Sequence, residues 1–408
     1  MNYLYNQMLR FVLGIGFVFN LLSSIYGQDT IRIMYYNLLN FPDESPERVE
    51  DLRQIVGYSQ PDILVVNELL TEAGSDLILN EALNVWGHDN YAAANFVDGP
   101  DTDNMLYYNS DLLGLKSQQQ IPTTLRDISE YLLFYKSPGL NAGSDTIFLN
   151  VYSVHLKAGS GDFNRRKEEA LILKYYLNSR EDVENVFVGG DFNFYSGNES
   201  GCLALRETGD VELHDPINSI GNWSGNSDYA EIHTQSTRTS ALADGAGGGM
   251  DDRFDLIFTT DDVFDNANGL EFIPGSYQAL GQDGDRFNGR INSPYNPSIP
   301  DSIADALYFM SDHLPVLMDL KTDFTADISE DIKTMLNWYY NSETNQLVFN
   351  ETIFAAEFQL YDLSGKLIFQ KNIQNTATIE LPSQLNGGLF CWSLRGSESL
   401  MNGKLVKQ

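Results

Sequence analysis

Two polar residues follow one short apolar run near the middle of the sequence. Asp191 and Asn193 come directly after Val186–Val188 and a pair of glycines. The run has the β-branched and aromatic character of a buried strand, and the glycines allow a tight turn where it ends. Side chains two residues apart on an extended chain point the same way. The pair could face one metal ion, water or phosphate, or cap the following turn as an Asx motif.

Residues that can bind a metal ion or transfer a proton also stand at the ends of five further predicted strands: Asn37, Glu68, His155, Asp255, and the adjacent Asp312 and His313. Carboxylate and amide oxygens suit Mg²⁺, Mn²⁺ or Ca²⁺, whereas two cysteines and five histidines in the whole chain argue against zinc. Phosphoryl chemistry needs such an ion together with an acid and a base, and histidine serves as either near neutral pH. The set therefore predicts a metal-dependent phosphoester site.

A strand–helix–strand pattern would bring the first two of these residues together. The run 31–36 reads as a strand that ends at Asn37, and the run 63–66 as a second strand that ends before Glu68. Between them, Ser45-Pro46-Glu47 has the features of a helix start, with a capping hydroxyl, a proline and an acid. The pattern predicts a parallel strand pair, and ligands bind beyond the carboxyl ends of such strands.

Two cations close to His155 are candidates for phosphate binding. Lys157 follows the histidine at the start of a glycine-containing loop, and Arg165 lies in the first turn of a predicted helix. A cation opposes the helix dipole at that position, which favours a functional role, although a solvated surface arginine is an equally good interpretation. The long turn-rich segment 195–253 is predicted to be functional or disordered.

The net charge restricts how a phosphate substrate could be held. With 57 acidic and 25 basic residues, the formal charge is −32. Such a surface repels polyanions, so a nucleic acid substrate would have to be bound locally, through divalent cations. High negative charge also favours solubility outside the cell.

The first 27 residues predict export. Arg10 precedes an apolar stretch at 11–19, and Gly27 offers a cleavage point, as in a secretory signal peptide, with an uncleaved anchor as the alternative. No later stretch is long and apolar enough to span a membrane. Cys202 and Cys391 fall in different predicted domains, which indicates two buried thiols and no disulfide framework.

Six motifs in order resemble those of the endonuclease/exonuclease/phosphatase superfamily, the DNase-I-like fold: YYNLLNF, PDILVVNEL, YSVHLKAG, GGDFN, RFDLIF and SDHLPV. The resemblance covers about residues 30–320. It implies an α/β four-layer sandwich, in which two packed mixed β-sheets are flanked by helices. It also implies cleavage of phosphodiester or phosphomonoester bonds with a divalent cation.

The resemblance also assigns roles. Glu68 would be the main metal ligand, with Asn37 beside it and Asp312 as a further ligand or support. His313, oriented by Asp255, would be the general base, and His155 the general acid or a phosphate ligand. Asp191 and Asn193 would orient water and phosphate, although members of the superfamily differ in whether the histidine or this aspartate activates water. Leu39 stands where many DNA-repair members carry a second acid, which favours the secreted DNase-like or sphingomyelinase-like branches.

The composition changes after Leu320. Residues 322–334 read as a polar, acidic linker, and residues 335–408 as a small all-β sandwich with alternating strands. The segments FQLYDLSGKLIF, LNGGLFCWSL and GKLVKQ are similar to the C-terminal sorting domain of the type IX secretion system. The proline-rich opening of that family is missing, so an adhesive or structural domain is the alternative.

The sequence thus predicts a signal peptide (1–27), a catalytic domain (28–321), a linker (322–334) and a sorting domain (335–408). The expected function is a secreted, Mg²⁺-, Mn²⁺- or Ca²⁺-dependent nuclease of low sequence specificity, exported by the type IX machinery. The alternatives are a hydrolase of phospholipid headgroups or other small phosphodiesters, and a binding protein that has kept the scaffold without turnover.

Overall fold

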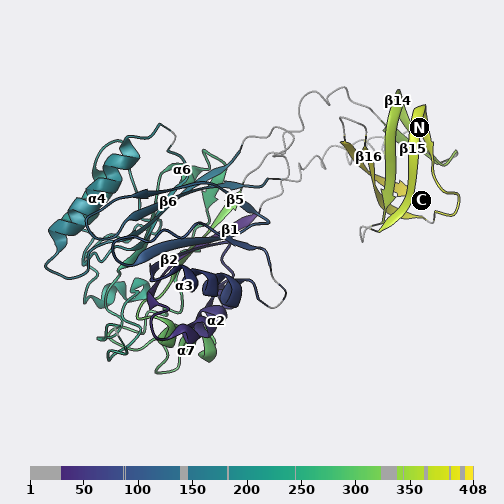
Figure 1. Ribbon diagram of the computed structural model, residues 1–408. Helices are drawn as coiled ribbons and strands as arrows, with labels where there is room; N and C mark the ends of the chain where they lie inside the picture. Colours follow the sequence, from purple (N-terminus) through teal and green to yellow (C-terminus); the bar gives the residue numbers. More distant parts are fainter. Residues whose placement is uncertain are drawn as a thin grey trace, which may run out of the picture. The chain divides into compact units, whose positions relative to one another are not determined.

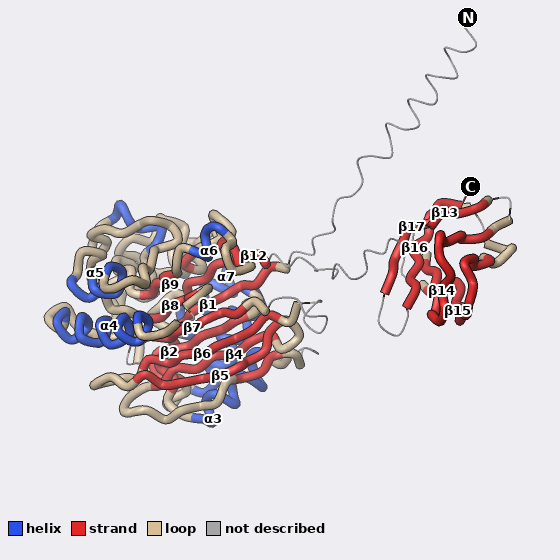
Figure 2. Tube along the Cα trace, turned by 90° about the horizontal axis from the view of Figure 1, so that it is seen from above, coloured by secondary structure: helices blue, strands red, loops and turns tan. Residues whose placement is uncertain are grey.

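The computed structural model describes residues 29–85, 87, 89–137, 146–181, 183–243, 245–322, 338–342, 344–362, 366–385, 387–395 and 400–407. The chain divides into two compact units, with the boundary between residues 326 and 327 (Figures 1 and 2). The predicted signal peptide, and the predicted linker apart from its first residue, lie outside the described residues. None of the described helices has the length and apolar character that a membrane span requires.

The first sheet of the larger unit has the strand order β10-β12-β1-β2-β4-β3, and β11 also pairs with β12. Only β1 and β2 run parallel, because a helical crossover joins them, and the other pairs are antiparallel. The strands are β1 (Thr30–Phe41), β2 (Ile63–Leu69), β3 (Tyr91–Ala93), β4 (Asp103–Asn109), β10 (Leu270–Phe272), β11 (Gln278–Ala279) and β12 (Val316–Thr322).

The second sheet has the order β5-β6-β7-β8-β9, with β7 and β8 parallel and the other pairs antiparallel. Its strands are β5 (Leu113–Ile121), β6 (Ile128–Tyr135), β7 (Phe148–His155), β8 (Val186–Asp191) and β9 (Asp255–Thr259). Each sheet therefore contains one parallel pair, and the strands of these pairs carry or adjoin Asn37, Glu68, His155 and Asp191.

Helical segments cover the outer faces of the two sheets. They are η1 (Pro46–Arg48), α2 (Val49–Ser59), α3 (Glu72–Leu77), the π-helical η2 (Ile78–Leu83), α4 (Phe163–Asn178), α5 (Ser200–Glu207), η4 (Ser227–Ile232), α6 (Asp262–Asp265) and α7 (Asp301–Met310). Figure 1 shows α4 on one side of the sheets and α2, α3 and α7 on the other. Figure 2 shows α4 and α5 together on one flank of the strands. The predicted four-layer α/β sandwich is confirmed.

The alternation of side chains along β8 shows how the layers pack. Phe187 belongs to the core that the two sheets share, whereas Val186 and Val188 belong to the core beneath α4 and α5. Successive side chains of a strand point to opposite faces, so a strand between two apolar layers must be apolar throughout. The continuous apolar run that suggested this strand reflects burial on both faces.

β5, α5 and η4 are among the elements that the sequence prediction did not contain. β5 lies between β4 and β6 along the chain, and α5 and η4 lie within the segment 195–253. β5 has a mixed pattern of exposed and buried residues because it is the edge strand of its sheet, which weakens the alternation that marks a strand. Cys202, on α5, is a buried free thiol as predicted, and Cys391 is a free thiol of intermediate exposure.

The smaller unit is all-β, as predicted, but its described strands belong to one sheet and not to the two sheets of the predicted sandwich. Its strands form one antiparallel five-stranded sheet: β13 (Trp338–Asn341), β14 (Gln346–Tyr361), β15 (Leu367–Glu380), β16 (Gly388–Arg395) and β17 (Leu400–Lys407). β14 is long enough to pair with β13 near its start, with β16 near its end, and with β15 along its length. Its core centres on Trp392, which packs edge-on against Trp338 with the ring centroids 5.0 Å apart.

A buried lysine on α4 provides a test of the packing between α4 and the segment after α5. Lys174 is fully buried and donates to the carbonyl oxygen of Val211, and burial lowers its pKa to about 8. The unfolded chain keeps this proton up to about pH 10.4, so between about pH 8 and 10 the unfolded state binds more protons and stability rises with pH. We expect the free energy of unfolding of the wild type, relative to Lys174→Met, to rise by about 1–3 kcal/mol from pH 7 to pH 10. Urea unfolding of both proteins measures this difference, and a pH-independent difference would contradict the packing.

Candidate active site

Three predicted site residues form one row across the second sheet. His155 at the end of β7 is paired in register with Asp191 at the end of β8, and Asp191 is paired with Asp255 at the start of β9. β9 runs antiparallel to β8, which explains why Asp255 opens its strand while the other two residues close theirs. One edge of the sheet therefore presents an imidazole and two carboxylates side by side.

The two glycines before Asp191 permit this close approach of the sheets. A Cβ atom on Gly189 would lie 2.5 Å from the ring of Tyr35 on β1. Gly190 has a φ of +130°, and a Cβ atom there would lie 2.1 Å from the carbonyl oxygen of Val154. Only glycine fits at either position, so the GGD sequence is needed to place Asp191 against the first sheet.

The first sheet contributes Asn37 and Glu68 from a distorted part of its parallel pair. Asn37 is paired in register with Asn67, and the pairing of β1 with β2 then shifts before Phe41. Glu68 has a φ of +59°, in the left-handed region that non-glycine residues rarely adopt. Such irregularities re-aim side chains and gather at functional sites. Here the distortion directs the Glu68 carboxylate toward the second sheet.

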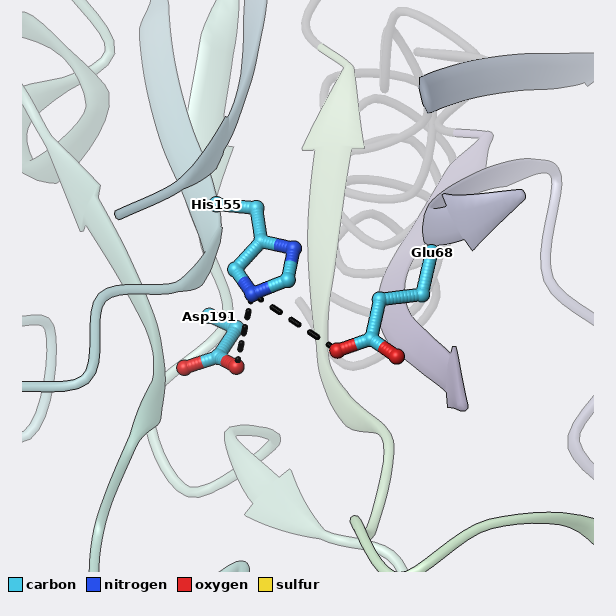
Figure 3. A group of neighbouring side chains, drawn as sticks. All are labelled: Glu68, His155 and Asp191. Carbon is cyan, nitrogen blue, oxygen red and sulfur yellow. Dashed lines mark ion pairs between the residues drawn. The ribbon is translucent and has the colours of Figure 1, made fainter. Parts of the chain in front are cut away.

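The side chains from the two sheets meet directly. Figure 3 shows the His155 ring between the Glu68 and Asp191 carboxylates. His155 Nε2 lies 3.6 Å from Glu68 Oε1 and 3.5 Å from Asp191 Oδ2 (Figure 3). Asn37 Nδ2 donates to the same two oxygens at 2.9 and 3.1 Å. Four of the predicted residues thus converge, and the Glu68 side chain, 15% exposed, is more accessible than those of His155 and Asp191.

His313 completes the site on the opposite side of Asp191. Its Nδ1 lies 2.7 Å from Asp255 Oδ2, and its Nε2 lies 3.7 Å from Asp191 Oδ2. The Gln235 amide nitrogen lies 2.7 Å from His313 Nε2 and also donates to Asp312 Oδ2 at 3.1 Å. In the tautomer that donates its Nδ1 proton to Asp255, Nε2 can accept from Gln235. The arrangement thus holds the imidazole with its basic nitrogen toward Asp191.

Burial and charge give the two histidines opposite properties. Burial, assisted by the nearby charges of Arg126, His313 and Lys157, lowers the pKa of His155 well below its ordinary value. Burial also acts to lower the pKa of His313, but the charges of Asp255, Asp191 and Asp312 outweigh it and raise that pKa well above its ordinary value. Burial raises the pKa of Asp191 to about 7, with Asp255 and Glu68 adding to the effect and His313 opposing it.

The residues around Glu68 and Asp191 fit a divalent cation. Ligand atoms of Glu68, His155 and Asp191 all lie within 4.8 Å of one another, and Asp191, Asp255 and His313 form a second group of this kind. Among the described residues, neither Glu68 nor Asp191 forms an ion pair with a lysine or arginine. The lowered pKa of His155 keeps its imidazole neutral, as metal ligation requires. Glu68, Asp191 and His155 could therefore hold a cation such as Mg²⁺ or Mn²⁺.

Asn37, Asn193 and Asp312 act on this centre in different ways. The Asn37 oxygen accepts from the Leu39 backbone N–H, so its amide nitrogen, and not its oxygen, faces the carboxylates. Asn193 has a φ of +50° and donates its side-chain amide to the Leu156 carbonyl oxygen. Asp312 was predicted as a metal ligand or support. It belongs to neither metal-binding group, and its Oδ2 accepts from Gln235 and from the Ala246 N–H, which favours the supporting role.

Lys157 and Arg165, which were predicted to contact phosphate, lie near the same aspartate. Lys157 and Arg165 both approach Asp162, at 3.9 and 3.6 Å, and the Arg165 side chain is 68% exposed. The structure therefore places the Arg165 side chain in solvent, next to Asp162. Its neighbour Arg166 is buried and donates to the Lys157 and Gly159 carbonyl oxygens, so it fixes the loop that follows His155.

Three residues of the site were missed by the sequence prediction or given no role in it. Gln235 contacts His313, Arg126 contributes to the lowered pKa of His155, and Asn67 donates to Asn104 and Ser153 while accepting from the Asp191 N–H. Asn67 follows the same apolar run as Glu68, so the strand-end pattern could have found it. Gln235 and Arg126 lie in loops without periodicity, where no such signal exists.

A buried ion pair fixes the residues just before β9, and its contribution to stability can be tested. Arg253, two residues before Asp255, is fully buried and donates to both oxygens of Asp215, at 2.8 and 2.9 Å. Burial acts to raise the pKa of Asp215, but the charge and hydrogen bonds of Arg253 outweigh it and lower that pKa below its ordinary value. We expect Asp215→Ala to reduce the free energy of unfolding by about 3–5 kcal/mol, because it leaves an uncompensated buried charge.

Thermal and urea unfolding would measure this loss. The matched control is the double variant Asp215→Leu/Arg253→Met, which removes both charges and should be less destabilised than Asp215→Ala alone. Equal destabilisation of the two variants would contradict a charge-based explanation and indicate a packing effect.

Two mixed sheets flanked by helices, with asparagine, acidic and histidine side chains meeting at their strand ends, are typical of the DNase-I-like fold. The chain belongs to the Endonuclease/Exonuclease/phosphatase family, whose sequence model matches residues 34–313. Members of this family are phosphodiesterases and phosphatases, generally hydrolytic and dependent on divalent metals. No curated protein sequence matches the chain significantly.

Solved structures also resemble the chain at low sequence identity. A family protein from Bacteroides thetaiotaomicron is 15% identical with a TM-score of 0.47, and the match covers 73% of this chain and 100% of that one. TDP2 from D. rerio, complexed with a single-strand DNA product, is 13% identical with a TM-score of 0.47, covering 72% and 99%. The mannosyl-6-phosphatase Bt3783 of B. thetaiotaomicron is 16% identical with a TM-score of 0.45, covering 71% and 99%.

Proposed function

We propose that the chain is a divalent-metal-dependent phosphodiesterase that cleaves DNA or RNA with little sequence preference. The observation that carries this proposal is the position of two histidines on either side of one carboxylate. His155 Nε2 and His313 Nε2 lie 3.5 and 3.7 Å from the same oxygen of Asp191. Hydrolysis of a phosphodiester requires one group to accept a proton from water and another to protonate the leaving oxygen. His313 would accept the proton from water. His155, which its lowered pKa keeps neutral, would bind the cation or a phosphate oxygen, and the leaving oxygen would take its proton from solvent.

The other residues would position these groups. Asp255 holds the His313 ring through Nδ1, and Asn37 holds the carboxylates of Glu68 and Asp191 in place. A cation held by Glu68, Asp191 and His155 would neutralise charge that develops on the phosphate oxygens. Its charge would also offset the carboxylates that now raise the pKa of His313, which favours the neutral, proton-accepting imidazole.

Export is part of the proposal. The N-terminal segment 1–27 supports it as a signal peptide, and the similarity of the tail to type IX sorting domains supports the all-β unit as an export address. In a host with the type IX machinery, the protein should appear in the medium or at the cell surface, and deletion of residues 335–408 should retain it in the periplasm. Equal export of the truncated chain would remove the tail from this role.

A second candidate, hydrolysis of a phospholipid headgroup or another small phosphodiester, is favoured by a pocket beside the site. The pocket has a volume of about 290 Å³, and its lining includes Leu39, Asn40, Leu242 and Phe309. The Asn40 N–H donates to Glu68 Oε2, so the pocket adjoins the catalytic centre. Its exposed leucine and phenylalanine could contact an apolar group of such a substrate.

One experiment separates these functions. The purified protein is incubated with plasmid DNA, RNA and sphingomyelin vesicles, each with Mg²⁺ or with EDTA. We expect cleavage of nucleic acid that EDTA abolishes and added Mg²⁺ restores. Cleavage of sphingomyelin alone would favour the second candidate, and no cleavage of any substrate would favour a binding protein.

A further inference from the structure

Two loops near the catalytic centre bring aspartates together outside the site described above. The loop before β4 carries Asp98 and Asp101, Asp103 is the first residue of β4, and the loop between β5 and β6 carries Asp127. Burial, followed by the charges of Asp98, Asp127 and Asp101, raises the pKa of Asp103 to about 6. Negative charge is therefore concentrated where the two loops meet.

Asp103 is buried, and one of its carboxylate oxygens has no partner. The residue is 5% exposed, and its Oδ1 accepts from the Gly99 N–H at 2.7 Å. Its Oδ2 is buried without a hydrogen-bond partner, and so is the hydroxyl oxygen of the adjacent Thr102. A buried carboxylate oxygen without a partner is costly, and natural proteins usually satisfy such a group with a hydrogen bond or an ion.

Two of these carboxylates, those of Asp103 and Asp127, approach Gly99. A Cβ atom placed on Gly99 would lie 3.0 Å from Asp103 Oδ1 and 4.0 Å from Asp127 Oδ2. Asp127 Oδ1 has only a long contact of 3.4 Å with the Thr123 N–H. Asp101 is already paired with Arg126, whose Nε lies 3.0 Å from Asp101 Oδ2. Asp103 and Asp127 are therefore the two carboxylates beside Gly99, and neither forms an ion pair with a lysine or arginine among the described residues.

We propose that a second divalent cation of the calcium type binds between these loops, with Asp103 and Asp127 as its carboxylate ligands. Calcium accepts carboxylate, hydroxyl, backbone carbonyl and water oxygens in flexible geometry, so two carboxylates at close range can anchor it. Magnesium requires near-ideal octahedral geometry and keeps most of its water, which makes it the poorer occupant of two surface loops.

Hydrogen bonds connect this site with the catalytic centre. Asn104, next to Asp103, donates to the backbone carbonyl oxygen of Asp127 at 2.9 Å. Its own oxygen accepts from Asn67 at 2.6 Å, and the Asn67 oxygen accepts from the Asp191 N–H at 3.3 Å. An ion that fixes the two loops would therefore also fix Asn67 between the two sheets, and with it the backbone of Asp191.

The proposal is tested by calcium-dependent thermal unfolding of the full chain after removal of bound metal with EDTA. We expect calcium at about a hundredfold excess over its dissociation constant to raise the unfolding midpoint of the wild type by about 5–10 °C. Asp103→Asn should lose this shift, and its metal-free midpoint should equal or exceed that of the wild type, because a buried unpaired charge is removed. Asp127→Asn, at a half-buried position, repeats the test if Asp103→Asn does not fold.

Two controls locate the ion. Glu68→Gln, altered in the catalytic centre, should keep the calcium shift, and Asp210→Asn, at an exposed position, should behave as the wild type. The proposal is overturned if the wild type shows no calcium shift, or if Asp103→Asn and Asp127→Asn keep it. It is also overturned if Glu68→Gln abolishes the shift, since the ion would then occupy the catalytic centre.

Discussion

Glu68→Gln is expected to lower kcat/KM for phosphodiester cleavage by about 10³-fold or more, with little loss of stability. The substitution removes one of the two carboxylates that meet at His155 Nε2 while keeping the size of the side chain and an oxygen that can accept from Asn37. Removal of a single electrostatic group from an active site commonly costs about 10²–10³-fold, and loss of a metal ligand adds weaker metal binding. Activity against Mg²⁺ concentration measures both effects.

The stability of this variant distinguishes a functional residue from a structural one. Glu68 contributes to the raised pKa of Asp191, so its charge disfavours the metal-free fold. We expect the metal-free midpoint of Glu68→Gln to equal or exceed that of the wild type, and its Mg²⁺-induced rise to disappear. Glu72→Gln, at an exposed position on α3, is the matched control. Activity of Glu68→Gln within about threefold of the wild type would show that the catalytic centre lies elsewhere.

The strand ends could be predicted from the sequence because a buried strand is an apolar run that stops at a polar residue. β2 and β8 are buried on both faces, so their apolar runs stop where the chain reaches the edge of the sheet. Polar residues at that point stand out, and the parallel pairs bring them to the same edge. This is why Asn37, Glu68, His155 and Asp191 could be grouped before their contacts were known.

The orientation of adjacent side chains could not be predicted in the same way. Asp312 and His313 both precede β12, and the sequence places them together in the site. Both side chains contact the Gln235 amide nitrogen, but only His313 also approaches Asp191, whereas Asp312 accepts from the Ala246 N–H. Arg165 and Arg166 differ in exposure because successive side chains of a helix point about 100° apart. Arg166 is buried and Arg165 is exposed.

The contact of Gln235 with His313 could not be predicted from sequence motifs. Gln235 lies in an irregular segment between η4 and β9, and its partner His313 is 78 residues further along the chain. Loops have neither the period of a strand nor that of a helix, so a single polar residue there carries no signal of its contacts. The structure was needed to show that this segment returns to the site and holds the imidazole of His313.

The second prediction with a large expected effect concerns His313, which Gln235 contacts. His313→Ala is expected to lower kcat about 10²–10⁴-fold, the range for loss of a general acid or base. Asp255→Asn should lower kcat by a similar amount, because an amide that donates to Nδ1 forces the proton of the neutral imidazole onto Nε2. Nε2, the nitrogen toward Asp191, could then no longer accept a proton from water.

The double variant Asp255→Asn/His313→Ala tests whether the two residues act as one unit. If Asp255 acts through His313, the double variant should be only slightly less active than His313→Ala, because groups that act together give non-additive losses. Asp261→Asn is the matched control, since Asp261 forms an equivalent pair with His214 at 3.0 Å on the exposed surface. Its activity should equal that of the wild type. Losses that multiply in the double variant would show that Asp255 serves the site independently of the imidazole, as a ligand for the cation or as a contact to the substrate.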